Sequence, residues 1–163
     1  MARRIFFSFH YERDVWRANQ VRNSWVTKPD REAAGFIDSA EFEKLRKQGD
    51  EAVKRWINSQ LEGTSVTVVL IGAETSEREW VKYEIKKSYE RGNGMLGIYI
   101  HKLKDQNGKI DYKGENPFET FYVEKNGQKI YLSEIYPTYD WVDDYGYNNL
   151  GDWIEKAAKQ AGR

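Results

Sequence analysis

The chain has 163 residues, of which none is cysteine, two are histidine and three are proline. The absence of cysteine excludes disulfide frameworks, thiolate zinc sites, iron–sulfur clusters and cysteine nucleophiles. His10 and His101 alone leave little for a histidine-rich metal site. With 15% aromatic residues, the chain is nevertheless too rich in rings to be disordered.

The sequence also lacks an excess of one charge, because 26 basic residues balance 26 acidic ones. A general nucleic-acid binder usually carries a basic excess, so we expect no nucleic-acid partner. Apolar runs are short. The run Ile5–Phe9 is too short for a signal peptide, and no stretch approaches the roughly 20 apolar residues of a membrane span. We therefore expect a cytoplasmic protein without membrane contacts.

Helical and extended patterns alternate along the first 100 residues. The order β-α-β-α-β-α-β predicts an α/β fold of the flavodoxin-like type, a parallel sheet with helices on both faces. The strands are expected over 5–9, 35–38, 65–71 and 95–100, and the helices over 15–25, 50–61, 79–91 and 149–161. We expect one domain over 1–163. Its segment 102–148 should be an irregular, loop-rich elaboration, with a strand at 129–132 after the turn Asn126-Gly127.

Glu84 stands out on the predicted helix 79–91. At 100° per residue from Trp80, it falls at about 40°, inside the apolar arc that holds Val81 and Ile85. A carboxyl group there would lose solvent, and its pKa would rise unless it were paired. Such groups are candidates for functional sites. A structural ion pair with Lys87 or Arg91 is the alternative.

Several further candidates lie where predicted strands end. Parallel sheets bind ligands outside the carboxyl ends of their strands. Ser8, Phe9, His10 and Tyr11 end the first strand, and Asp38 ends the second. Edge packing for His10 and Tyr11, and capping of a following helical turn by Asp38, are the alternatives.

Two other patterns have structural and functional interpretations. Residues 92–97 match GxGxxG, but they follow a helix and precede a strand, so Gly92 reads as a helix C-cap rather than part of a dinucleotide site. Residues 139–148 are rich in aromatic and acidic side chains. They could stack on a ring, but a packed strand end with a polar turn is the favoured interpretation.

These pieces, in this order, resemble the Toll/interleukin-1 receptor (TIR) domain family, and within it the ThsB family of bacterial Thoeris anti-phage systems. The resemblance rests on Phe6–Phe9 as the first strand, on Gly35–Asp38 as the second, and on Trp80 and Glu84 in the Trp-x-x-x-Glu spacing of enzymatic TIR proteins. It covers most of the chain and is closest before residue 105. The segment 105–135 looks shorter than in that family.

The resemblance implies an enzyme that cleaves the nicotinamide–ribose bond of NAD and releases a cyclic ADP-ribose isomer. It implies Glu84 as the catalytic residue, with substrate contacts from Ser8, Phe9, His10, Tyr11, Asp38, Trp80 and Tyr83. NAD is then the substrate, and neither a metal nor a cofactor is expected. The implied partners are the effector ThsA, reached through the cyclic product, a phage-derived trigger and further copies of the chain.

Two alternatives to this activity remain. A non-catalytic TIR-fold module could signal by self-association, since one fold hosts both roles. A receiver-like domain phosphorylated on Asp38 is the weaker alternative, because the acidic cluster of such a site is not visible at the strand ends.

Overall fold

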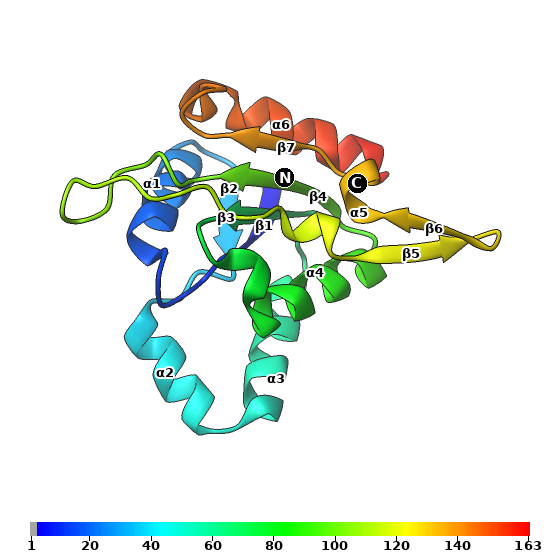
Figure 1. The fold of residues 1–163 in the computed structure, drawn as a ribbon, viewed down its shortest axis with the longest axis horizontal. Coiled ribbons are helices and arrows are strands. Elements are labelled where there is room, and N and C mark those ends of the chain that lie inside the picture. The colour runs from blue at the N-terminus through cyan, green and yellow to red at the C-terminus, as the bar shows by residue number, and fades with distance from the viewer. Residues whose placement is uncertain (1–2) are drawn as a thin grey trace.

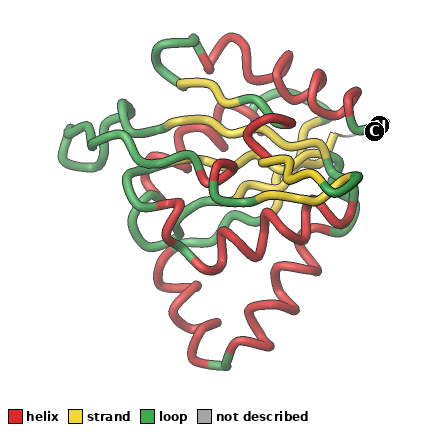
Figure 2. Tube along the Cα trace, turned by 45° about the vertical axis from the view of Figure 1, so that its right-hand side comes forward, coloured by secondary structure: helices red, strands yellow, loops and turns green. Residues whose placement is uncertain are grey.

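The computed structural model describes residues 3–163 and places a five-stranded parallel sheet between two layers of helices (Figures 1 and 2). The strand order is β2-β1-β3-β4-β7, which is that of a flavodoxin-like fold. Every residue of β3 is buried, as expected for a central strand covered on both faces. The strands are β1 (Arg3–Ser8), β2 (Arg31–Ala34), β3 (Val66–Ile71), β4 (Gly94–Tyr99) and β7 (Thr138–Asp140).

The helices divide between the two faces of the sheet (Figure 1). Helices α1 (Val15–Val26) and α6 (Gly146–Gln160) pack together on one face, while α3 (Asp50–Leu61) and α4 (Glu79–Arg91) cover the other. In α4 the buried side chains are those of Val81, Glu84, Ile85 and Ser88, a spacing that turns one stripe of the helix toward the sheet. The stripe that buries the apolar residues therefore also buries Glu84.

The second strand lies earlier than the sequence predicted. It spans Arg31–Ala34 rather than 35–38, because Gly35 leaves the extended conformation at φ +76°. A Cβ there would lie 2.6 Å from the carbonyl oxygen of Phe7, so this position needs glycine. A helix that the sequence did not predict follows, α2 (Ser39–Lys47), which packs against α3. Phe42 is its only buried residue, so little of this helix contributes to the core.

The segment 102–148 contains long loops, and part of it is anchored in a core. The short helix η2 (Pro117–Glu119) buries Phe118 against a second apolar cluster that includes Ile71 and Met95. A projecting hairpin, β5 (Tyr122–Lys125) and β6 (Gln128–Tyr131), turns at Asn126-Gly127, where φ is positive at both residues. The predicted turn is confirmed, and the short helix α5 (Leu132–Ile135) leads back toward β7.

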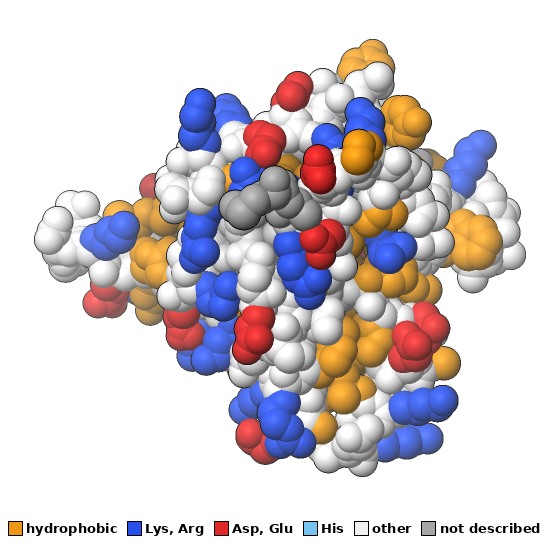
Figure 3. All heavy atoms as spheres, turned by 180° about the vertical axis from the view of Figure 1, so that it is seen from behind, with side chains coloured by type: hydrophobic (Ala, Val, Ile, Leu, Met, Phe, Trp, Pro, Cys, Tyr) orange, Lys and Arg blue, Asp and Glu red, His pale blue; other side chains and the backbone are white. Residues whose placement is uncertain are grey.

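The surface mixes charges. On the face seen from behind Figure 1, basic and acidic side chains are interspersed (Figure 3). Among residues 3–163, no helix is both long enough and apolar enough to cross a bilayer.

Candidate active site

Glu84 lies at the carboxyl edge of the sheet, beside the point where the strand order reverses. The chain leaves β1 toward β2 on one side and returns to β3 on the other, and ligands of such sheets bind at this switch point. Ser8 is the last residue of β1, and the turn that follows it carries Tyr11. Helix α4 begins at Glu79, after the 3-10 turn η1 (Thr75–Glu77). It brings Glu84 into contact with Ser8 and Tyr11.

Two hydroxyl groups hold the Glu84 carboxyl group. Ser8 Oγ donates to Oε1 at 2.7 Å, and the Tyr11 hydroxyl donates to Oε2. No part of the Glu84 side chain is exposed to solvent. The alternative ion pair with Lys87 is not formed, since Lys87 Nζ instead lies 3.5 Å from Glu90 Oε1. Glu84 is thus held by neutral donors rather than by a cation.

This environment favours the protonated carboxyl group. Burial raises the pKa of Glu84 from 4.5 to about 8, and the hydrogen bonds from Tyr11 and Ser8 lower that pKa only in part. Burial, and next the negative charge of Glu84, raise the pKa of Tyr11 well above 10. Tyr11 therefore stays protonated and remains a hydrogen-bond donor at any physiological pH.

Aromatic rings pack around Tyr11. The Tyr11 ring lies 4.8 Å from the Phe9 ring and 4.7 Å from that of Phe42, measured between centroids. Trp56 meets it edge-on at 5.9 Å. Phe42 and Trp56, from α2 and α3, were not among the predicted site residues, and no motif marks them. Both rings pack on Tyr11, whose hydroxyl contacts Glu84, so they help to hold Tyr11 over a carboxyl group that has no exposed surface.

His10 and Trp80, two further predicted site residues, are buried and half-buried. His10 is buried in the same turn, where its Nδ1 accepts a hydrogen bond from the Arg13 backbone N–H at 3.1 Å. Burial, followed by the charge of Arg78, lowers the pKa of His10. Trp80 lies half-buried on α4 and meets Tyr83 edge-on at 5.8 Å between centroids.

Tyr83 and Asp38 lie outside the hydrogen-bonded group around Glu84. The Tyr83 hydroxyl reaches Asn58 of α3 at 3.4 Å. Asp38 does not end a strand. It is exposed and caps α2, accepting a hydrogen bond from the Glu41 backbone N–H at 2.8 Å. The capping alternative thus describes Asp38, since its predicted position rested on the misplaced second strand.

A cationic pair lies beside the turn that carries Tyr11. The side chains of Arg78, just before α4, and Arg46, in α2, converge on Glu12 Oε1 at 2.7 and 3.2 Å. Arg46 also contacts Glu43 at 3.2 Å, within its own helix. All of these side chains are partly exposed. Sequence reasoning missed this pair, because its members come from separate segments.

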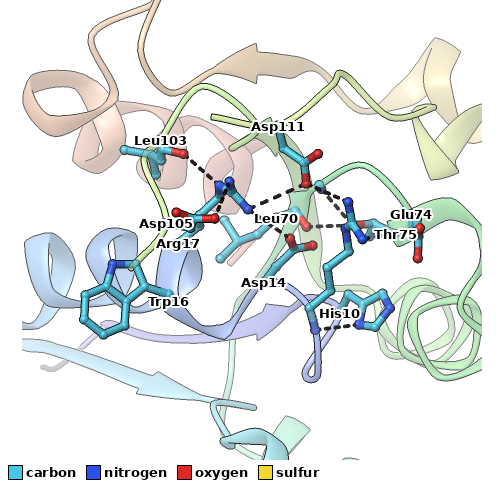
Figure 4. A network of polar contacts seen from close by, with 12 residues as sticks. His10, Asp14, Trp16, Arg17, Leu70, Glu74, Thr75, Leu103, Asp105 and Asp111 are labelled. Atoms are coloured by element: carbon cyan, nitrogen blue, oxygen red, sulfur yellow. Dashed lines mark hydrogen bonds and ion pairs between the residues drawn. The ribbon is translucent and has the colours of Figure 1, made fainter. Parts of the chain in front are cut away.

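A second polar cluster joins α1 to the loop after β4 (Figure 4). Arg17 donates to the carbonyl oxygens of Leu103 at 2.7 Å and Lys109 at 2.9 Å, which ties that loop down. Asp14, the residue before α1, is buried with neither oxygen hydrogen-bonded within the described chain, and Arg17 Nη1 lies 3.9 Å away. Burial raises the pKa of Asp14 to about 6, against the opposing effect of Arg17. Asp14 stands at the N-cap position of α1, but its side chain makes no capping hydrogen bond.

The aromatic and acidic stretch 139–148 packs against α6. Tyr139 of this stretch stacks on Trp153 of α6 at 4.1 Å between centroids, which agrees with a packed strand end.

Within 3–163, no three His, Asp or Glu side chains lie close enough together to share a metal ion. The expectation that neither metal nor cofactor is needed stays a prediction.

The parallel sheet and the buried glutamate of α4 define a TIR-like domain. More specifically, the chain belongs to the ThsB family: residues 6–105 match the family described as Thoeris protein ThsB, TIR-like domain. It is 40% identical to a Bacillus cereus (strain MSX-D12) protein named "Putative cyclic ADP-D-ribose synthase ThsB1", over 94% of this chain and 100% of that protein. The alignment spans 191 positions, so at least 28 of them have no counterpart among the 163 residues here.

Proposed function

We propose that this protein cleaves NAD at the nicotinamide–ribose bond and closes the remaining ADP-ribose into a cyclic product. The observation that carries the proposal is Glu84, a buried carboxyl group held by two hydroxyls at the switch point of the sheet. The relative named a cyclic ADP-D-ribose synthase supports the reaction type.

The chemistry requires a carboxylate next to the ribose. The bond between ribose C1′ and the pyridinium nitrogen breaks, and nicotinamide departs as a neutral molecule with the bonding electron pair. The positive charge moves to the ribose as an oxocarbenium-like species, which a nearby carboxylate stabilises, much as in glycosidases. A nucleophilic atom of the same ADP-ribose then bonds to C1′ and gives up one proton. Glu84 is protonated at rest, loses its proton to solvent as the cationic substrate approaches, and as a carboxylate takes up the proton that the nucleophile gives up.

Exclusion of water decides between cyclisation and hydrolysis. Water competes with the internal nucleophile for C1′, so a dry site favours the cyclic product. The rings of Phe9, Phe42 and Trp56 form an aromatic wall around the Tyr11 ring, next to a carboxyl group that has no exposed surface. We propose that this wall continues to shield the ribose when NAD is bound.

The biological setting follows from membership of the Thoeris ThsB family. We propose that the cyclic product acts as a second messenger in anti-phage defence and activates the separate effector ThsA. A phage-derived trigger and self-association are proposed to switch the enzyme on, and the cytoplasm is the compartment where NAD, phage and effector meet.

The test follows nicotinamide release from NAD by chromatography, with the protein alone and with lysate of phage-infected cells. We expect the wild type to release nicotinamide when triggered, and Glu84→Gln to reduce the rate about a hundredfold or more, since an isosteric amide cannot carry the charge. Glu90→Gln, an exposed carboxylate on the same helix, is the matched control and should behave as wild type.

Two outcomes would contradict the proposal. Equal release by wild type and Glu84→Gln would remove Glu84 from the mechanism. A triggered wild type that assembles but leaves NAD intact would favour the non-catalytic interaction module. Mass spectrometry of the product distinguishes a cyclic ADP-ribose isomer from linear ADP-ribose.

A further inference from the structure

In the turn between β1 and α1, the consecutive side chains of Tyr11 and Glu12 contact groups that a bound substrate would also contact. Tyr11 puts a hydroxyl on Glu84, and Glu12 puts a carboxylate on Arg46 and Arg78. NAD carries both kinds of group, the ribose hydroxyls and an anionic pyrophosphate. We infer that Tyr11 and Glu12 occupy the place of NAD in the resting protein, and that Arg46 and Arg78 bind its pyrophosphate once Glu12 has moved away. This inference rests on the proposed function for the identity of the ligand.

Access to Glu84 requires one of its two partners to move. Glu84 has no exposed surface, so no substrate atom can reach it in the state described. Ser8 is fixed in the sheet, because it is the last residue of β1 and pairs with Val69 of the central strand β3. Tyr11 belongs to a turn outside the sheet. A ribose hydroxyl that replaces the Tyr11 hydroxyl restores the same hydrogen bond, so the exchange leaves no buried acceptor unsatisfied.

The charges around Glu12 suit an anion with two charges. Two guanidinium groups from separate elements converge on a single oxygen of Glu12, at 2.7 Å from Arg78 and 3.2 Å from Arg46. One carboxylate thus faces two cations, with Glu43 as a further partner of Arg46 alone. Guanidinium groups bind phosphate oxygens through paired hydrogen bonds. A pyrophosphate in this position would match both arginines.

The third arginine of this edge is less suited to the role. Arg13 already faces two carboxylates, Glu74 at 3.4 Å and Asp111 at 2.9 Å. Its charge is therefore more than balanced by its neighbours. Glu74 offers a matched control carboxylate: it is partly exposed at the same edge and pairs with Arg13 rather than with Arg46 or Arg78.

The test measures NAD affinity by isothermal titration calorimetry, with every variant in the full-length Glu84→Gln background so that NAD is not consumed. We expect Glu12→Gln to tighten NAD binding about threefold to tenfold, because a larger share of the molecules has the arginines free. Arg78→Gln and Arg46→Gln should each weaken it about fivefold or more, and Glu74→Gln should leave it unchanged. Nicotinamide riboside lacks the pyrophosphate, so its affinity should not respond to either arginine.

Several results would overturn the inference: unchanged NAD affinity in Glu12→Gln, no measurable NAD binding by that variant, or an equal loss for NAD and nicotinamide riboside in Arg78→Gln. The two proposals fail separately. If Glu84-dependent nicotinamide release is found but these affinities do not change, only the inference is wrong. If the affinities change as expected but no nicotinamide is released under triggering conditions, the proposed reaction is wrong and the NAD site stands.

Discussion

Replacing Glu84 by glutamine should stabilise the protein relative to the wild type, and this difference should increase as the pH rises. Glutamine has nearly the same shape as glutamic acid but cannot ionise, and the hydroxyls of Ser8 and Tyr11 can reorient to accept from its amide. Wild-type Glu84 must instead stay protonated or place a charge where no solvent reaches it. Ionisation of Glu84 therefore makes its own contribution to the pH dependence of the free energy of unfolding.

The sign and the size follow from the two pKa values. The pKa of Glu84 is 4.5 without the fold and about 8 within it. Because the folded state holds the proton more tightly, the stability from this group is fully present below pH 4.5 and is lost as the pH rises to about 8. The loss is about 1.4 kcal/mol per pH unit, so the difference between Glu84→Gln and wild type should grow by up to about 5 kcal/mol across that window.

Urea denaturation followed by circular dichroism, at pH 5, 6, 7, 8 and 9 in constant salt, measures this difference. We expect it to increase up to about pH 8 and then level off. Glu90→Gln, exposed on the same helix, should show no such trend. A Glu84→Gln difference that stays constant from pH 5 to 9 would refute the reasoning, because Glu84 would then titrate alike in the folded and unfolded chains.

Three further predictions concern other parts of the fold. Asp14→Asn should abolish a loss of about 3 kcal/mol that the wild type suffers between pH 3.8 and about 6; equal pH dependence in both proteins would contradict this. Gly94→Ala should lower the free energy of unfolding by about 1–3 kcal/mol, because the new Cβ would lie 2.3 Å from the Ala157 carbonyl oxygen of α6; an unchanged urea midpoint would disprove the close packing. Phe118→Ala should cost about 3–5 kcal/mol in one cooperative transition, since this ring is fully buried; a separate early transition would show that 102–148 unfolds on its own.

Much of the fold could be predicted from local patterns. The helix 79–91 and the turn at Asn126-Gly127 were predicted with the bounds observed, because apolar periodicity and turn chemistry are local properties. The second strand was misplaced, because the apolar residues Phe36 and Ile37 belong to the segment after the strand, beyond the positive φ of Gly35. Helix α2 was missed, because it buries only Phe42 and depends on packing against α3.

Residue spacing alone places Glu84 on the buried side of a helix, because helical geometry fixes which residues share a face. The sequence also determined the family, through motifs spread over the first 105 residues. The partners of Glu84, by contrast, depend on tertiary packing. Ser8 and Tyr11 are more than 70 positions away, and the folding of β1 against β3 and α4 brings them to it. The same holds for Glu12, Arg46 and Arg78, whose convergence depends on how separate elements pack and leaves no trace in local spacing.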